Sequence, residues 1–446
     1  MTKSRLLFGV FSGILASTIA STALYAQANI GAGEGHEEAT TPAGRRTPDP
    51  GVTVRQLTGG PRNHYFGYIG QCRTIPWNDT GRYILCLETL IQDRLPEAGD
   101  PAGVCLYDTT TGQLRVVDQT RGWNPQQGTM FYWNPEHPET QFFFNDRDVK
   151  TGKIFTVLYD ITAGLDGKGG RIREYCFDGC PVANGGVAQN GRYFFAINYA
   201  RMARLRPVTG YKGATDWTDG VAAPEDDGIH RVDINTGERK LIVSFARLRE
   251  AIRPMDPKRI DTRHLFINHT LANRNNDLIY FFCRADFETE PQTRINVPFT
   301  VRQDGTGLTA HSIFIGGHPD WDSGAYMIGS NSDKQVIYDT ATKKIIGDLG
   351  GNELYTDTEG DISVSPNGRW FVNGDRIGKY NYYIFLDRKT GRTLKSPGVY
   401  MADWTIKWGA LRLDPAPAWN RESNAIVVPG IAGDDTRQMF MISLPD

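Results

Sequence analysis

Four side chains that could hold a divalent metal ion recur along the second half of the chain. His269, His318, Asp361 and Asp414 each lie shortly before a polar turn that is followed by an apolar run. Imidazole nitrogens combined with carboxylate oxygens suit Mn²⁺, Zn²⁺ or Ca²⁺. The alternative is a hydrogen-bonded ring in which each histidine is satisfied by a neighbouring aspartate. The first interpretation predicts a metal centre, and the second predicts a structural polar cluster.

Arginine side chains indicate a second kind of chemistry, the recognition of an anion. The segment 198–207, NYARMARLRP, contains three arginines. If this segment is a strand, Tyr199 and Arg201 face the same side. Together with Arg284 and Arg412 they could receive a carboxylate or a sulfate, because both groups match the fork of a guanidinium. A solvated basic edge is the alternative.

The composition excludes several classes of protein. The chain has 446 residues, of which 39% are hydrophobic and 11% aromatic, so most of it must fold around a core. The formal net charge of −2 argues against nucleic acid as a partner, since binding to nucleic acid usually needs a basic surface. The 49 glycines and 24 prolines indicate many turns, and therefore many short strands.

The first residues are typical of a targeting segment. Lys3 and Arg5 precede a long apolar run, and the small-x-small sequence AQA ends at residue 28. We interpret residues 1–28 as a signal peptide and residues 29–51 as a flexible lead-in. An uncleaved membrane anchor is the alternative for the apolar run. With the signal removed, we expect a periplasmic or secreted protein with no membrane association.

Export would also allow cysteines to form disulfides. Cys176 and Cys180 could close a small loop, and Cys86 and Cys105 could lie on neighbouring strands. The sequence does not decide either pairing. Half of a zinc site is the alternative for Cys176 and Cys180, although the chain has no second pair of this kind.

One sequence unit occurs seven times and predicts the architecture. It consists of an aromatic or small residue, a polar turn and an apolar run, as in WNDTGRYILCL from Trp77 and WNPEHPETQFFF from Trp133. A second unit, apolar-Asp-x-x-Thr-Gly as in YDTTTG, follows most copies and is typical of a tight hairpin. Each pair of units therefore encodes four short antiparallel strands. Seven such sheets make an all-β fold, a seven-bladed β-propeller over residues 52–446.

The two ends of this repeat array complement each other. The last copy stops one strand short, and residues 52–58 form a strand with no partner of their own. We therefore expect residues 52–58 to pair with residues 439–444 and to close the ring. Two separate β domains are the alternative.

In a propeller the innermost strand of each blade lines a central channel, and the residues just before each polar turn belong to that strand. Sites are enriched in such concave mouths. The polar residues at these positions form one candidate set: His64, Gln126, Gln127, Asn184, His264, His269, His318, Glu359, Asp361, Arg412 and Asp414.

Several segments resemble a known family. The segments are HYFGY from His64, QQGTMFYW from Gln126, INYARMARLRP from Ile197, DDGIHRVDINTGE from Asp226 and FINHTLAN from Phe266. They are similar to secreted seven-bladed polysaccharide lyases, of the oligogalacturonate lyase and ulvan lyase groups. The resemblance implies cleavage of a uronic-acid glycan by β-elimination. In such enzymes an arginine or a metal neutralises the carboxylate, and a tyrosine or histidine removes the proton at C5.

The resemblance also implies roles for individual residues. We expect Arg201 to neutralise the carboxylate and His264, or Tyr199, to act as the base. The remaining candidates fall into a substrate-binding set and a metal set: His64, Gln127, Arg284 and Arg412 for the first, and His269, His318, Asp361 and Asp414 for the second.

Two other functions are consistent with the same residues. One is a binding or scaffold propeller of the cell envelope, without catalysis. The other is a glycoside hydrolase that uses two channel carboxylates, such as Glu359 and Asp361, which needs Asp414 from another blade if those two lie too close together. The leading expectation is an exported lyase whose partner is an acidic polysaccharide or oligosaccharide.

Overall fold

The computed structural model describes residues 46–67, 74–164, 167, 169–287, 293–402, 409 and 411–445. All of them belong to one compact unit, residues 37–446. The predicted signal peptide and most of the predicted lead-in lie outside the described residues. None of the described helices is long and apolar enough to span a membrane.

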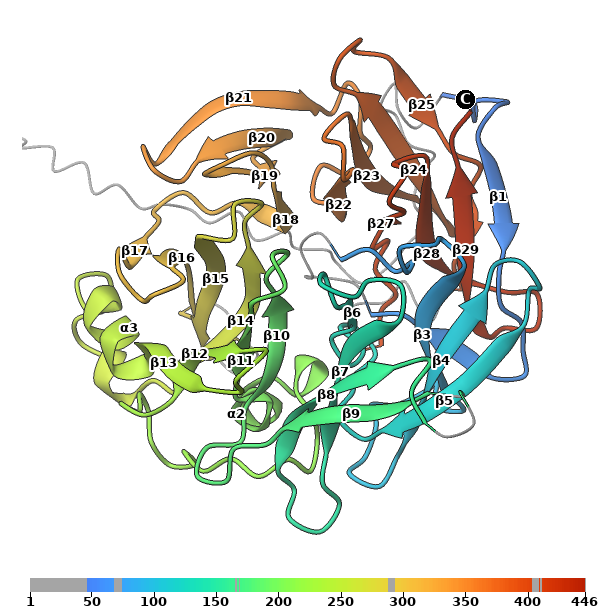
Figure 1. Cartoon of the computed structure of the whole chain (residues 1–446). Helices are drawn as coiled ribbons and strands as arrows, with labels where there is room; N and C mark the ends of the chain where they lie inside the picture. Colours follow the sequence, from blue (N-terminus) through green and yellow to red (C-terminus); the bar gives the residue numbers. More distant parts are fainter. Residues whose placement is uncertain are drawn as a thin grey trace, which may run out of the picture. The chain divides into compact units, whose positions relative to one another are not determined.

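The described strands form seven antiparallel sheets arranged in a ring, and Figure 1 shows β6, β10, β14, β18, β22 and β27 on the side of their sheets toward the centre. Blade one contains β2 (Asn63–Tyr65), β3 (Tyr83–Thr89), β4 (Ala102–Asp108) and β5 (Leu114–Thr120). Blade two contains β6 (Tyr132–Trp133), β7 (Gln141–Arg147), β8 (Ile154–Asp160) and β9 (Gly170–Tyr175). Blade three contains β10 (Ala183–Val187), β11 (Tyr193–Ile197), β12 (Gly228–Asp233) and β13 (Arg239–Ser244).

The second half of the ring repeats this order. Blade four contains β14 (Phe266–Ala272), β15 (Leu278–Ala285), β16 (Ile295–Arg302) and β17 (Thr309–Ala310). Blade five contains β18 (Gly316–Trp321), β19 (Tyr326–Asn331), β20 (Lys334–Asp339) and β21 (Lys344–Gly351). Blade six contains β22 (Ile362–Val364), β23 (Trp370–Ile377), β24 (Tyr380–Asp387) and β25 (Thr393–Lys395), with β26 (Val399–Tyr400) also paired to β24.

Blade seven is built from both ends of the propeller. It contains β27 (Ala418–Trp419), β28 (Ala425–Ile431) and β29 (Arg437–Ser443), and β1 (Thr53–Gln56) completes it. Thr53 pairs with Ser443 and Gln56 with Phe440, and Figure 1 shows the blue β1 beside the red β29. This confirms the predicted seven-bladed propeller and its closure by the N-terminal strand.

The aspartate side chain of the second repeat unit stabilises the hairpin turn. In blade one, Oδ1 of Asp108 accepts hydrogen bonds from the amides of Thr110 and Thr111 at 2.8 and 3.2 Å, and Gly112 then takes a φ of 69°. Asp233 and Asp387 make the same pair of bonds in blades three and six. The unit therefore encodes its turn locally, because the carboxylate replaces a backbone acceptor.

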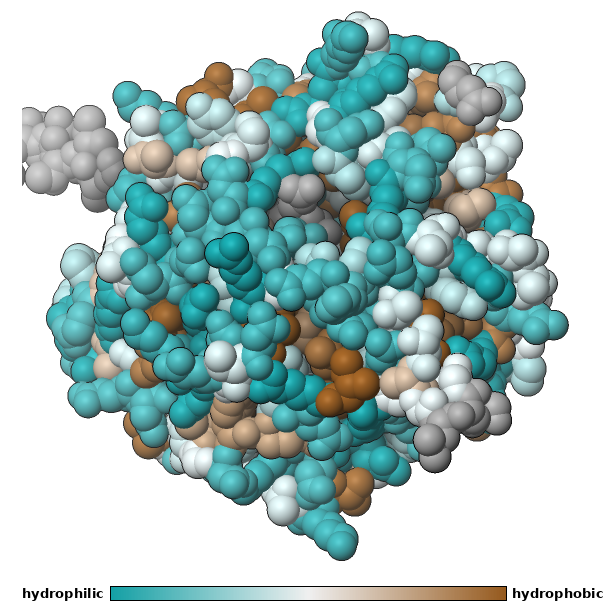
Figure 2. Space-filling model, viewed as in Figure 1, coloured by the Kyte–Doolittle hydropathy of each residue, from teal (hydrophilic) through white to brown (hydrophobic). Residues whose placement is uncertain are grey.

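Tryptophans of the first repeat unit connect consecutive blades. The indole N–H of Trp133 donates to the carbonyl of Pro76 at 2.8 Å, and that of Trp321 donates to the carbonyl of Leu271 at 2.7 Å. Both side chains are buried, as is Trp419. Hydrophobic clusters likewise extend across blade boundaries, while the face seen in Figure 2 is mainly hydrophilic. These tryptophans are therefore packing residues between blades.

The described helices are short and lie in two connections. They are α2 (Tyr199–Leu205) with the 3-10 turn η1 (Pro207–Thr209), and α3 (Phe245–Ile252) with η2 (Ile260–Thr262). Segment 198–207 is thus a helix and not the predicted strand. Asn198 explains the difference, because its side chain accepts a hydrogen bond from the amide of Arg201 at 2.9 Å and so caps the helix.

The described cysteines are free thiols. Cys86 and Cys105 lie directly opposite each other on β3 and β4, as predicted, and both are fully buried. Cys176 is exposed and Cys180 is half-buried.

Candidate functional site

Two histidines occupy equivalent positions on the inner strands of neighbouring blades. His269 lies on β14 and His318 on β18, and both have left-handed φ angles, of 61° and 50°. Each lies within a register shift between its strand and the next one. Such bulges turn side chains away from the regular alternation and are frequent beside active sites. The two rings lie 5.5 Å apart between centroids and are inclined at 70°.

Asp361 orients the second of these histidines. Nδ1 of His318 is hydrogen-bonded to Oδ1 of Asp361, while Oδ2 accepts from the amide of Ala416 at 2.8 Å. Burial by itself would raise the pKa of the Asp361 carboxyl, but the charge of His318 and its hydrogen bond outweigh burial, and the net shift is downward. Asp361 is therefore ionised, and it fixes the tautomer and direction of the His318 ring.

A cation completes the arrangement. Nε of Arg412 donates to Oδ1 of Asp414 at 2.8 Å. Burial raises the pKa of Asp414, although the charge of Arg412 opposes this, and Asp361 and His318 also act on it. His269, His318, Asp361, Arg412 and Asp414 therefore form one interacting group, which we call the channel cluster. The structure brings together all four predicted metal ligands.

Gln127 extends the channel cluster toward blade two. Its Nε2 lies 3.3 Å from Nδ1 of His269 and donates to Oδ1 of Asn268 at 3.4 Å. Only 2% of Gln127 is exposed. In this structure the carboxamide thus positions His269 and is not presented to a ligand.

Several donor atoms of the channel cluster are engaged with other groups of the protein. Both oxygens of Asp361 accept hydrogen bonds, and Asp414 is paired with the guanidinium of Arg412. Among the described residues, no group of three or more His, Cys, Asp or Glu side chains could hold a metal ion. His318 is paired with an aspartate, as the alternative expectation had it, whereas the described contact of His269 is with the amide of Gln127.

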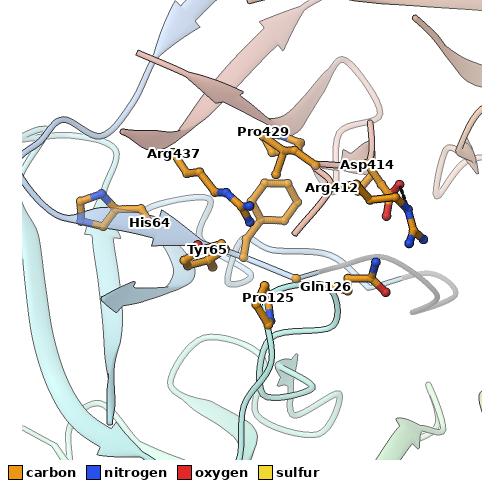
Figure 3. A pocket seen from close by; sticks show the side chains of 12 residues that line it. His64, Tyr65, Pro125, Gln126, Arg412, Asp414, Pro429 and Arg437 are labelled. Carbon is orange, nitrogen blue, oxygen red and sulfur yellow. Dashed lines mark hydrogen bonds and ion pairs between the residues drawn. The ribbon is translucent and has the colours of Figure 1, made fainter. Parts of the chain in front are cut away.

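A pocket opens beside the channel cluster, between blades one, two and seven. Figure 3 shows Arg412 and Asp414 next to Gln126, with Arg437 and Tyr65 on the far wall. With the amide of Gln126 oriented to satisfy both groups, its oxygen accepts from Nη1 of Arg412 at 2.8 Å. Arg412 is thus held from two sides, and 21% of its side chain remains exposed.

Arg284 lies at the end of β15 and is close enough to Arg412 for their charges to interact. Its Nε donates to Oδ1 of Asn296 at 2.9 Å, and its guanidinium lies 4.7 Å from the ring of Phe282. The structure thus places two of the predicted anion-binding arginines, Arg284 and Arg412, near one another.

Arg201 and Tyr199 lie in a different environment. The guanidinium of Arg201 donates to the carbonyls of Leu265, Val221 and Ala222 at 2.6–3.0 Å, and 1% of the residue is exposed. Tyr199 is stacked on Tyr211 at 4.3 Å, and burial raises its pKa well above the usual value. Because the segment is a helix, the two side chains do not share a strand face. Both residues hold α2 against blades three and four.

His264 also lies apart from the channel cluster. The charges that act on it come from α2 and from the loops around it, and they belong to Arg204, Arg201, Asp219 and Asp286. Burial lowers the pKa of His264, and the two arginines lower it further. Its Nδ1 is buried without a hydrogen-bond partner among the described residues.

His64 lines the pocket at its edge, where Figure 3 shows it away from Arg412 and Asp414. Its Nδ1 lies 2.7 Å from Oε1 of Gln438, and its Nε2 lies 3.5 Å from a carboxylate oxygen of Glu88. His64 thus links blades one and seven.

The carboxylates expected for a glycoside hydrolase do not form a working pair. Asp361 is 5% exposed and both of its oxygens accept hydrogen bonds, whereas Glu359 is exposed. A hydrolase needs two carboxyl groups that face a common bond. The arrangement therefore does not favour the hydrolase.

Three residues near Arg284 were not singled out from the sequence as site residues. Arg206, Arg294 and Phe287 come from the end of α2 and from the connection between β15 and β16. Arg206 belongs to the arginine-rich segment that the sequence indicated. No sequence signal distinguishes Arg294 or Phe287, because only the packing of blades three and four brings them together.

Comparisons with known proteins support the fold. No family model matches the chain, and no curated protein matches it. Among solved structures, an oligogalacturonate lyase from Vibrio parahaemolyticus is 13% identical, with a TM-score of 0.56, over 89% of this chain and 95% of that one. An oligogalacturonate lyase in complex with manganese is 14% identical, with a TM-score of 0.55, over 92% and 96%. The chain therefore has the seven-bladed propeller fold of these lyases.

Proposed function

We propose that the protein is a polysaccharide lyase that cleaves a uronic-acid glycan by β-elimination. The observation that carries the proposal is the channel cluster, in which a histidine oriented by a buried carboxylate lies beside a partly exposed arginine. β-Elimination at a uronate needs a base for the C5 proton and a fixed cation for the charge that spreads onto the carboxylate. The fold shared with two oligogalacturonate lyases supports the same class of reaction.

His318 is the base in this proposal. Its Nδ1 is fixed by Asp361, 28% of its side chain is exposed, and the structure records no partner for Nε2 among the described residues. Nε2 is therefore available to remove the C5 proton. His318 replaces the predicted His264 in this role, because His264 lies apart from the channel cluster.

Arg412 is the cation. It replaces the predicted Arg201, whose guanidinium is engaged with backbone carbonyls. His318 takes the C5 proton, and the C–H electron pair spreads onto the carboxylate. That pair then forms the C4–C5 double bond as the C4–O bond breaks. The leaving oxygen keeps that bond's electrons and takes up a proton from water. Arg412 stabilises the enolate-like carboxylate that forms in between.

The substrate in this proposal is an acidic polysaccharide or oligosaccharide, and the enzyme is exported. Two arginines support an anionic substrate, because Arg412 of the channel cluster and the nearby Arg284 have interacting charges. Export is supported by the predicted signal peptide, residues 1–28.

The proposed lyase activity is tested by a screen of acidic polysaccharides for the ultraviolet absorbance of the unsaturated uronate product. On a substrate that the parent protein cleaves, His318→Gln should reduce kcat by about 10²–10⁴-fold. Arg412→Ala should lose about 10²–10³-fold, and Arg412→Lys should recover part of that loss, since lysine cannot form the planar fork. Asp361→Asn should also reduce kcat and alter the pH profile, because the tautomer of His318 would no longer be fixed.

The controls are exposed residues of the same types. His137 lies in an exposed turn, and the side chain of Arg302 is 58% exposed, so His137→Gln and Arg302→Ala should keep the parental kcat. If His318→Gln and Arg412→Ala also kept the parental kcat, the assignment of His318 as the base and Arg412 as the cation would be wrong. Tight binding of an acidic glycan without any unsaturated product would instead support a binding propeller.

A further inference from the structure

Three guanidinium groups surround a single aromatic ring at one end of blade four. The guanidinium carbons of Arg206, Arg284 and Arg294 lie 4.4, 4.7 and 4.6 Å from the centroid of the Phe287 ring. Because all three carbons lie close to the same centroid, no two of them are farther apart than the sum of their distances to it. Phe287 itself is partly buried against the hydrophobic core. We call these four residues the arginine cage.

The cage is assembled from two blades. Arg284 lies on β15, and Arg294 immediately precedes β16. Arg206 lies at the C-terminal end of α2, in the connection between the second and third strands of blade three. The strand ends and the capped helix are rigid elements. They therefore hold the three guanidinium groups in place before any ligand binds.

Arg284 is the most buried of the three arginines of the cage. Arg284 is 8% exposed, and its only hydrogen bond within the described residues joins Nε to the neutral side chain of Asn296. No described carboxylate is paired with Arg284 or Arg294, and the neighbouring Asp286 is paired with Arg263 instead. Burial, and then the charges of Arg206 and Arg294, lower the pKa of Arg284. A buried cation among like charges is costly unless an anion compensates it.

We propose that the arginine cage binds a second anionic group, a carboxylate or a sulfate, of the same glycan chain that reaches the channel cluster. This inference rests on the proposed function. Two features carry it. The terminal amino groups of Arg284 have no partner among the described residues and can form the paired bonds that carboxylates and sulfates accept. The cage also lies close enough to the channel for Arg284 and Arg412 to interact. The substrate is therefore an oligomer with at least two acidic groups.

The experiment compares substrates of different length. Arg294→Gln and Arg284→Gln should raise KM for a long acidic oligosaccharide by about tenfold each, the usual effect of removing one charge-assisted hydrogen bond. The increase should be much smaller for the shortest oligosaccharide that is cleaved. Arg302→Gln, on the exposed end of β16, is the matched control and should change neither value. Arg294 is exposed, so its variant tests the cage even if Arg284→Gln fails to fold.

A second measurement tests the cage independently of catalysis. Millimolar sulfate should raise the melting temperature of the parent protein above that in chloride of equal ionic strength, and Arg284→Gln/Arg294→Gln should abolish the difference. This result would stand even if no glycan were cleaved, so failure of the cage and failure of the proposed function can be distinguished.

Two outcomes would overturn the proposal. One is an equal rise of KM for short and long substrates in Arg294→Gln, with no response of the parent protein to sulfate. The other concerns Glu288 and Glu290, which lie outside the described residues. If Glu288→Gln/Glu290→Gln responded to sulfate and the parent protein did not, the chain's own carboxylates would already fill the cage.

Discussion

Arg201 shows how a residue suited to catalysis can be used for structure. Its guanidinium donates to backbone carbonyls of the loop 218–222 and of Leu265, and it lies 4.7 Å from the ring of Phe245. A buried arginine that donates to several carbonyls in this way stabilises irregular backbone. The chemistry of the channel is left to His318 and Arg412, which keep exposed atoms.

At the same scale, Asp375 makes stability depend on pH. It is fully buried on β23, and burial raises its pKa to about 7. An unfolded aspartate ionises near 3.8, so the folded state holds a proton that the unfolded state has lost between about pH 4 and pH 7. The stabilising effect is complete below this window and is lost as pH rises through it.

Asp375→Asn should therefore flatten the decline in unfolding free energy between these two pH values. The decline due to Asp375 should amount to roughly 2–4 kcal/mol. Denaturant titrations at a series of pH values measure it, with Asp333→Asn at an exposed position as the control. The slope is the readout, so a uniform loss of stability in the variant does not matter. An unchanged slope would contradict the assignment.

At the scale of elements, the closing strand β1 depends on a small number of backbone hydrogen bonds. The amide of Leu57 donates to the carbonyl of Met439 at 2.8 Å. In an antiparallel pair, consecutive backbone amides of one strand point alternately toward and away from the partner strand. The amide of Arg55 therefore also points at β29, while that of Gln56 points away. The loss of a backbone amide from β1 should therefore weaken closure at Arg55 but not at Gln56.

Arg55→Pro should lower the unfolding free energy by about 1–3 kcal/mol, since it removes a bond of the ladder that closes the ring. Gln56→Pro is the matched control and should cost clearly less, because its amide makes no bond to β29. Urea denaturation of both variants gives the comparison. Equal losses would show that the register of β1 differs from the one described.

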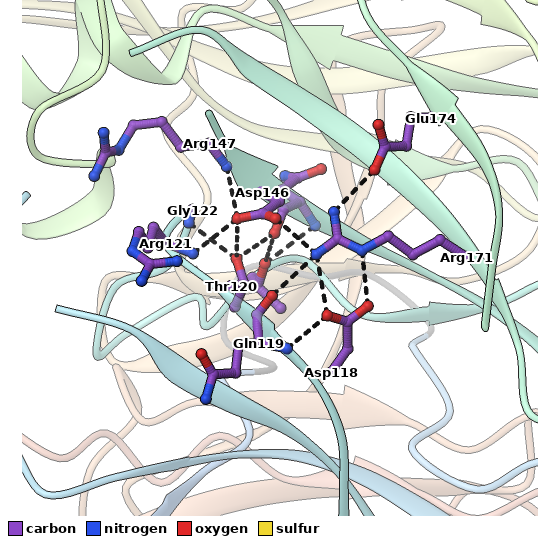
Figure 4. A network of polar contacts seen from close by, with 11 residues as sticks. Asp118, Gln119, Thr120, Arg121, Gly122, Asp146, Arg147, Arg171 and Glu174 are labelled. Carbon is purple, nitrogen blue, oxygen red and sulfur yellow. Dashed lines mark hydrogen bonds and ion pairs between the residues drawn. The ribbon is translucent and has the colours of Figure 1, made fainter. Parts of the chain in front are cut away.

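At the scale of the whole molecule, the blades are connected by polar contacts as well as by their hydrophobic faces. Figure 4 shows Arg171 of β9 in blade two bridging to blade one. Its guanidinium donates to Asp118 of β5 at 2.8 and 3.1 Å and to the carbonyl of Gln119 at 3.1 Å. It also binds Asp146 at 2.8 Å and Glu174 at 2.9 Å within its own blade.

Arg171→Ala should reduce the unfolding free energy by about 1–2 kcal/mol, because it leaves three carboxylates without their common cation. Arg82→Ala is the comparison. Arg82 makes a similar two-bond contact with Asp108, but within one blade and at the surface, so its loss should cost clearly less than the loss of Arg171. Thermal unfolding distinguishes the two. A larger loss for Arg82→Ala would contradict a special role for contacts between blades.

The sequence alone predicted the ring of seven blades and the closing strand. These features depend on local signals, since an aspartate that bonds the amides after it and a run of alternating apolar residues act within a few positions. The sequence also identified every member of the channel cluster as a candidate site residue, because polar residues at the inner strands are recognisable by their place in the repeat.

The tertiary structure decided how those residues are used. The left-handed bulges that aim His269 and His318 occur at non-glycine residues, which no sequence pattern marks. Asn198 turned a predicted strand into a helix, which took Arg201 and Tyr199 away from the channel. The arginine cage depends on Arg206 of blade three meeting Phe287 of blade four. Register shifts and contacts between blades join residues far apart in the chain, so only the folded molecule determines them.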